Sequence, residues 1–139
     1  PTPGWQYYVS DPHGLSFQYP AHWQVSSNFA YRLEGSDGFV ELLATNSQDN
    51  LLVNACNDAA YGTAVPIEWI TVAGQEACLI RADDDSQATL IVRFPEPRKN
   101  LVPGVAYTFL VLQADPAHMP GFVQTLTFFT PADSPTPIP

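Results

Sequence analysis

Hydrophobic and polar residues alternate along much of this chain, and a period of two predicts β-strands. The clearest case is residues 15–19, where apolar and polar side chains alternate until Pro20 ends the run. Glycine, proline and aspartate separate the apolar segments, which is typical of tight turns. The pattern predicts strands over residues 5–9, 15–19, 23–25, 29–33, 38–44, 67–72, 75–82, 87–94, 105–114 and 125–128.

Only one stretch has the three- and four-residue spacing of an amphipathic helix. Its apolar positions are Leu51, Leu52, Ala55, Cys56, Ala59 and Ala60. Ser47 is a suitable N-cap, Asp49 stands in the first turn, and Gly62 follows the end. A second, weaker helix is predicted from Asp115, as its N-cap, to about residue 124.

Most of the predicted connections are hairpins, which favours an antiparallel sheet. Residues 95–104 are predicted to form a loop that carries Arg98 and Lys99, a small basic spot. The long apolar strand 105–114 is predicted to be central. The fold class is therefore α+β: a mostly antiparallel β-sheet flanked by one or two short helices, as an α/β/α sandwich.

Proline concentrates at both ends of the 139-residue chain. Proline fixes φ and lacks an amide donor, so such segments stay extended and act as semi-rigid linkers. We interpret residues 1–4 and 130–139 as linkers around a single domain over residues 5–129. The linkers predict a domain that is tethered, or cut from a longer chain; two untethered, frayed ends are the alternative.

The acidic net charge of the chain excludes some classes of binding partner. Charged residues make up only 14% of the chain, and the formal net charge is -9. Nucleic acids and anionic membranes are recognised by clustered Lys and Arg, so neither is an expected partner. No apolar run reaches the roughly 18 residues of a transmembrane helix, so no direct membrane insertion is expected.

The two cysteines, Cys56 and Cys78, allow one disulfide or two buried thiols. Cys56 lies on the apolar face of the predicted helix, which must pack on the sheet. In strand 75–82 either alternate face can meet that helix, so the pattern leaves both interpretations open. A disulfide would indicate maturation outside the reducing cytosol.

The common catalytic and nucleotide-binding motifs are missing from the sequence, and no cofactor is expected. The histidines His13, His22 and His118 are far apart and stand in turn-like contexts, so we expect them to face solvent. The run 83–85 lacks the spaced ligands of a calcium loop and is interpreted as a solvated hairpin tip. No metal site is predicted.

Four aromatic residues are the candidates for ligand binding: Trp5, Tyr7, Trp23 and Tyr31. Exposed aromatic rings can stack on a sugar or a peptide. Trp23, however, follows the strand-ending Pro20 and has a competing interpretation as a core corner, since a buried Trp removes about 200 Å² from water. Alternation places Trp5 and Tyr7 on one face without showing whether that face is wet.

The stretch YVSDPHGLSFQYPAHW, which ends at Trp23, resembles the opening of PsbP-like domains. Their opening has an aromatic strand, a Gly-hydrophobe-Ser-hydrophobe strand and then Tyr-Pro-x-x-Trp. The final strand–helix–strand, the helix before Gly62 and the strand pair around Gly74 resemble them too. The resemblance covers residues 5–129 and implies an α/β/α sandwich around an antiparallel sheet.

The resemblance implies little about activity, because PsbP-like proteins include photosystem II subunits, a Ran-binding import factor and bacterial extracytoplasmic lipoproteins. The last group fits this chain best. We therefore expect a non-enzymatic accessory or binding domain outside the cytoplasm: secreted, periplasmic or tethered to the cell surface. Its partner would be an unknown protein, small molecule or saccharide. The alternatives are a carbohydrate-binding module and an enzyme with an unrecognised carboxylate/His site.

Overall fold

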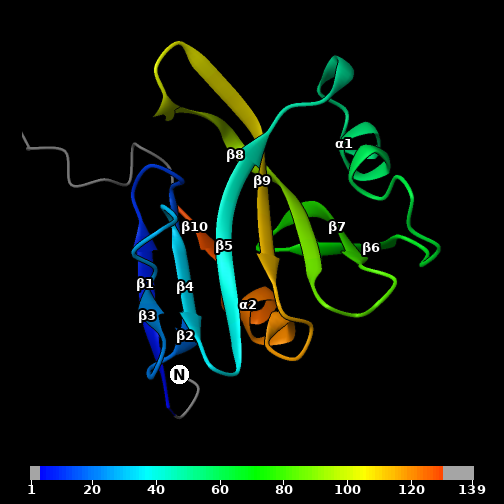
Figure 1. Ribbon diagram of the computed structural model, residues 1–139. Coiled ribbons are helices and arrows are strands. Elements are labelled where there is room, and N and C mark those ends of the chain that lie inside the picture. Colours follow the sequence, from blue (N-terminus) through cyan, green and yellow to red (C-terminus); the bar gives the residue numbers. More distant parts are fainter. Residues whose placement is uncertain (1–3, 130–139) are drawn as a thin grey trace, which may run out of the picture.

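Two antiparallel β-sheets and two α-helices make up the part of the chain that the computed structural model describes, residues 4–129 (Figure 1). The predicted α+β class is thereby confirmed. Residues 1–3 and 130–139, which contain nearly all of the predicted linkers, lie outside the described residues.

The large sheet has seven strands in the order β3-β4-β5-β9-β8-β7-β6. Their bounds in that order are Gln24–Val25, Arg32–Gly35, Gly38–Thr45, Val105–Ala114, Ala88–Val102, Gln75–Arg81 and Glu68–Val72. The strand that was predicted to be central, β9, is the middle one. Two strands form the edges of this sheet, the two-residue β3 and the five-residue β6.

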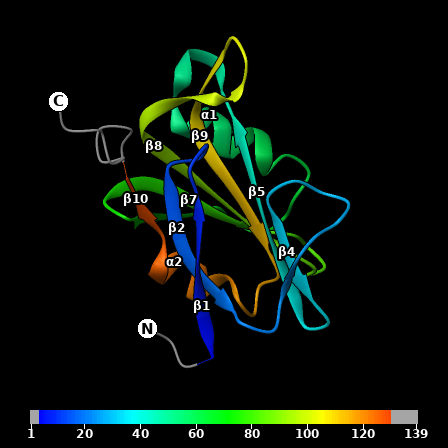
Figure 2. The same ribbon diagram turned by 90° about the vertical axis from the view of Figure 1, so that its left-hand side faces the viewer.

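A small sheet of three strands packs on one face of the large sheet (Figure 2). Its order is β1-β2-β10, with bounds Trp5–Ser10, Leu15–Pro20 and Thr127–Phe128. Helix α2 (Met119–Thr125) packs beside β2 in the same layer. The alternation pattern predicted these strands, but it holds no information on which sheet each strand joins.

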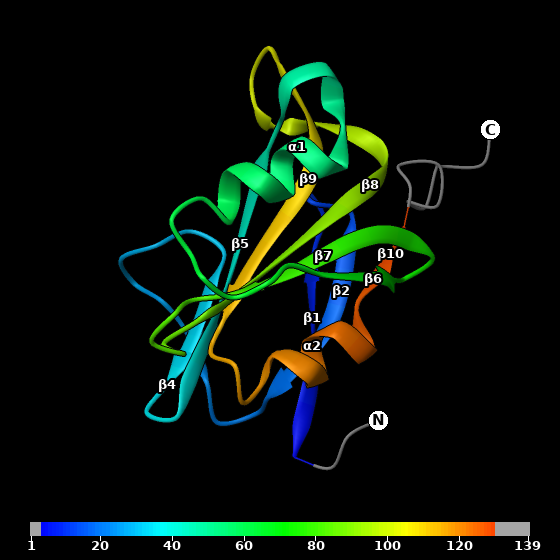
Figure 3. The ribbon, with the colours of Figure 1, turned by 90° about the vertical axis from the view of Figure 1, so that its right-hand side faces the viewer.

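Helix α1 (Leu52–Ala59) covers the opposite face of the large sheet (Figure 3). The central strand β9 contributes side chains to the hydrophobic cores on both faces of the large sheet. Leu110 and Leu112 belong to the core under the small sheet, whereas Phe109 and Val111 belong to the core under α1. Successive side chains of a strand point to opposite faces, so this apolar run is buried on both sides.

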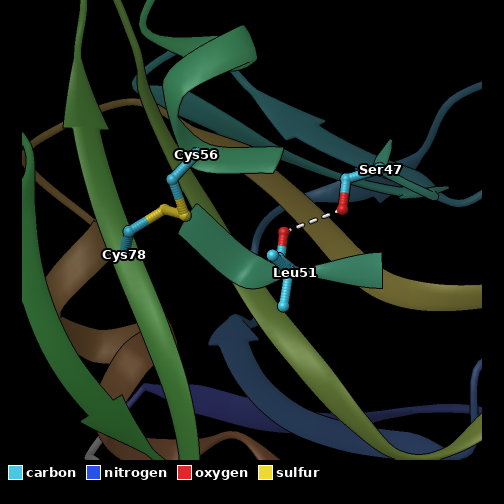
Figure 4. The surroundings of a disulfide bond; sticks show 4 residues. All are labelled: Ser47, Leu51, Cys56 and Cys78. Atoms are coloured by element: carbon cyan, nitrogen blue, oxygen red, sulfur yellow. Dashed lines mark hydrogen bonds between the residues drawn. A yellow bond between two sulfur atoms is a disulfide. The ribbon is translucent and has the colours of Figure 1, made fainter. Parts of the chain in front are cut away.

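The predicted start of α1 is wrong. A 3-10 turn, Gln48–Asn50, comes first, and Leu51 takes the N-cap position with extended φ and ψ. Ser47 does not cap the helix; its Oγ donates to the Leu51 carbonyl oxygen at 2.8 Å (Figure 4). The Ser47 hydroxyl thus bonds to the backbone of a turn instead of capping α1. Serine side chains commonly form such local bonds to the backbone, and these compete with helix capping.

The predicted start of α2 also differs, and for a similar reason. Asp115 Oδ2 accepts the backbone N–H of His118 at 3.1 Å, so its carboxylate closes a turn over residues 116–118. The helix begins only at Met119.

The prediction of a loop over residues 95–104 is wrong, because β8 continues to Val102 and pairs with β9 up to Val102–Val105. Strand β7 accompanies β8 only as far as Val92. Beyond that point β8 has a free edge, where Pro95 and Pro97 need no amide donor.

Candidate functional site

The edge strand β6 carries Trp69, which is the most solvent-exposed of the three tryptophans. Trp69 is 52% exposed, while Trp23 is almost fully buried. Trp69 pairs directly with Cys78 on β7, so its indole leaves the sheet on the α1 face. In Figure 3, β6 lies between α1 and α2. A large aromatic side chain left in water on a sheet edge marks a candidate interaction site.

On the α1 face, Trp69 borders an open hollow of about 550 Å³, which we call the α1 hollow. It is lined by Leu51, Leu52, Val53, Trp69, Ile70, Thr71, Glu76, Ala77 and Arg93. Leu51 and Val53 are about half exposed, so the apolar wall of the hollow is in contact with water.

The helical wall of the α1 hollow is fixed to the sheet at two points. The disulfide Cys56–Cys78 joins α1 to β7, with Cα atoms 6.4 Å apart (Figure 4). The Arg93 guanidinium lies over the Phe109 ring and donates to the Asn50 carbonyl oxygen at 3.3 Å. Of the two interpretations that the sequence left open for the cysteines, the structure has the disulfide. Together, the two attachments hold the segment that carries Leu51 at the hollow that Trp69 also lines.

The opposite face of β6 borders a second hollow of about 370 Å³, which we call the α2 hollow. It is lined by Glu68, Ile70, Thr71, Leu79, Arg81, Ala88, Pro116, Met119, Pro120, Val123 and Gln124. Apolar side chains form its walls, and Glu68, Arg81 and Gln124 add polar groups. This size and mixture are typical of sites for small molecules or side chains.

Helix α2, the other wall of that hollow, is held by polar contacts at both ends. Asp115 accepts the Phe39 backbone N–H on β5 at 3.0 Å. Thr125 Oγ1 accepts the Gln18 backbone N–H on β2 at 3.0 Å and donates to the Gly121 carbonyl oxygen. The hollow is therefore bounded by segments that are tied to both sheets.

A polar cluster at the far edge of the large sheet brings two of the three histidines together. Asp37 Oδ1 lies 2.8 Å from His22 Nε2 and accepts the Trp23 indole N–H at 2.8 Å. Asp37 Oδ2 lies 3.6 Å from His118 Nε2, and His118 Nδ1 lies 2.7 Å from Asp115. Hydrogen bonds from His22 and Trp23 lower the pKa of Asp37 to about 2.

This cluster joins three segments that are far apart in the sequence: the turn after β2, the β4–β5 turn and the start of α2. Gly38 makes the approach possible, because a Cβ there would collide with Asp115. Among residues 4–129, no set of three or more His, Cys, Asp and Glu side chains is placed so that it could hold a metal ion. The contacts of Asp37 therefore support a role in joining these segments.

The expectation that His13 faces solvent is wrong. His13 is 2% exposed, and its Nδ1 lies 2.7 Å from Ser10 Oγ. Burial lowers the pKa of His13 to about 4, and the charge of Arg98 acts in the same direction. Arg98, expected in a basic loop, is itself buried and donates to the carbonyl oxygens of Asp11 and Pro12. Both side chains hold the β1–β2 turn.

The four predicted ligand-binding aromatics do not form one exposed row. Trp23 is buried in the core, where its ring meets His118 with centroids 4.9 Å apart, which confirms its interpretation as a core residue. Trp5 is half-buried against α2, close enough that a Cβ at Gly121 would collide with it. Tyr31 lies against His13, and Tyr7 is 64% exposed on β1.

Near β6, the sequence predicted the exposed turn 83–85 but not the exposed Trp69. The run 83–85 is exposed at the β7–β8 turn, as predicted, and Asp83 also accepts the Ala64 backbone N–H at 2.8 Å. Trp69 was missed as a candidate. The only signal was a large aromatic side chain on a short strand that follows Pro66, since periodicity does not tell an edge strand from a central one.

No protein-family model matches the chain, and no curated protein matches its sequence significantly. No helix within the described residues is long and apolar enough to cross a membrane.

Proposed function

We propose that this chain is a non-enzymatic binding domain that works outside the cytoplasm and recognises a partner protein at β6. The observation that carries the proposal is the exposed indole of Trp69 on an edge strand, between the α1 hollow and the α2 hollow. Tryptophan is enriched at the energetic centres of protein interfaces, because it buries a large area with little loss of side-chain entropy.

The disulfide supports the extracytoplasmic part of the proposal, since disulfides persist mainly in oxidising compartments. The PsbP-like resemblance stays a prediction. The antiparallel sheet with a helix on each face agrees with what that resemblance implies.

A peptide-display selection tests the binding function. The folded domain is immobilised, and peptides of random sequence are selected and then measured singly by calorimetry. Trp69→Ala is expected to weaken the selected peptides by roughly 30-fold, as the loss of a central interface residue does. Tyr61→Ala is the matched control, because Tyr61 is 91% exposed and does not line either hollow.

Selection of no peptide, or equal binding by wild type and Trp69→Ala, would contradict a binding role for this edge. The compartment is tested separately by alkylating the native protein before reduction. Two freely alkylated thiols would remove the support that the disulfide gives.

A further inference from the structure

Strand β6 has an unprotected outer edge. Of the described strands it pairs only with β7, in an unbroken register from Glu68–Leu79 to Val72–Gln75. Its outward backbone groups have no hydrogen-bond partner among residues 4–129. Natural edge strands are usually guarded by inward charges, proline or a bulge. After Glu68 at its first position, β6 continues with Trp, Ile, Thr and Val and has none of these devices.

The two hollows lie on opposite faces of this one strand. Among the residues of β6, Trp69 lines only the α1 hollow, Glu68 lines only the α2 hollow, and Ile70 and Thr71 border both. Successive side chains of a strand alternate between the two faces of a sheet. A strand added to β6 would therefore direct alternate side chains into the α1 hollow and into the α2 hollow.

Charge around β6 distinguishes between possible occupants. The exposed turn 83–85 adds three carboxylates near the start of β6, where Asp83 holds the Ala64 backbone. Glu68 and Glu76 add two more, against Arg81 and Arg93. A second copy would bring a net charge of -9 against the same charge, which disfavours self-pairing. A basic partner is attracted instead.

We propose that β6 binds an extended segment of a partner protein by adding it as an eighth strand to the large sheet. Alternate apolar side chains of that segment enter the α1 hollow and the α2 hollow, and a Lys or Arg lies beside the turn 83–85. Backbone hydrogen bonds supply affinity in such strand addition, and the hollows supply specificity. The inference rests on the proposed binding function and adds the mode of recognition.

Backbone N-methylation of a selected peptide tests the mode. Methylation of one amide at a time removes a single donor and leaves the side chains unchanged. The added-strand arrangement predicts a period of two: about tenfold weaker binding where the amide faces β6, and little change at the residues between. Trp69→Ala, measured with the same peptides, shows whether they bind at this edge at all.

The outcomes separate the two claims. Peptides that need Trp69 but show no two-residue period, or that bind as helices, would overturn strand addition and leave the binding function standing. Peptides that ignore Trp69 would overturn both. A dimer of the free domain that Trp69→Ala dissociates in sedimentation would identify a second copy as the occupant, against this proposal.

The charge requirement has its own variant. Asp84→Asn/Asp85→Asn removes two carboxylates and leaves the Asp83–Ala64 contact in place. It is expected to weaken a basic peptide roughly two- to fivefold at low salt and to have no effect at high salt. Asp58→Asn, on α1 away from both hollows, is the matched control. Equal binding by the two variants at low salt would contradict the role of the turn.

Discussion

Trp69 and Cys78 occupy directly paired positions on β6 and β7, so the exposed indole and the buried disulfide lie on the same face of the sheet. The covalent bond that holds α1 on the sheet therefore also fixes the wall opposite Trp69. Stability and the shape of the α1 hollow are coupled through this pair.

The disulfide is expected to contribute about 3 kcal/mol to the free energy of unfolding, because it closes a loop between residues 22 positions apart. Cys56→Ala/Cys78→Ala should lose that amount in urea denaturation. It should also weaken any peptide that enters the α1 hollow. Unchanged stability in the double variant, relative to the oxidised wild type, would contradict a constraining role.

Trp23→Ala is expected to lower the free energy of unfolding by about 3–5 kcal/mol, as deletion of a large core aromatic does. The substitution also removes the indole N–H donor to Asp37. Tyr7→Ala, on the exposed face of β1, is the control and should change stability by less than about 0.5 kcal/mol. Similar melting temperatures for both variants would argue against a core position of Trp23.

His13 makes stability depend on pH. The native pKa is about 4 against an ordinary 6.5, so between these values the unfolded state binds more protons than the native state. The free energy of unfolding therefore falls as the pH is lowered from 6.5 to 4, by up to about 3 kcal/mol.

Denaturation curves across that pH range measure the effect. His13→Gln should flatten the dependence between these pH values, whereas His22→Gln, at an exposed position, should keep it. A wild-type stability that does not fall in this window would contradict the burial of a neutral His13.

Asp37 is expected to titrate near pH 2 in the native protein, below its ordinary 3.8. Because the folded-state pKa is the lower one, the contribution of Asp37 is present above pH 3.8 and is lost as the pH falls toward 2. Carbon-detected NMR of the side-chain carboxyl reports this pKa directly. In His22→Ala it should rise, and an ordinary value in the wild type would count against the cluster.

The sequence predicted the local elements better than their assembly. Alternation located β2, β5 and β9, because each has one face or both faces in the core. It did not reveal that β1, β2 and β10 form a separate sheet, since pairing depends on contacts between distant segments. The proline-rich end of β8 was predicted to be a loop because proline is rare inside β-sheets. In the structure this segment lies on a free sheet edge, where proline is tolerated, and the sequence does not show which segments lie on an edge.

The candidate site was harder to predict for the same reason. Trp23 was correctly interpreted as a core residue from its position after Pro20, and Cys56 and Cys78 proved to be neighbours. The convergence of His22 and His118 on Asp37 left no local signal, since it joins three distant turns. Trp69 became a candidate only once the fold placed its strand at an edge between two hollows.

The most direct test of recognition at β6 is amide hydrogen exchange of the labelled domain, free and saturated with a selected peptide. In the free protein, the outward amides of β6 have no partner within the part of the chain that the structure describes, and they are expected to exchange fast. The account predicts that alternate β6 amides become protected when the peptide binds, while the inward ones change little. Unchanged exchange along β6, with new protection elsewhere on the domain, would contradict it.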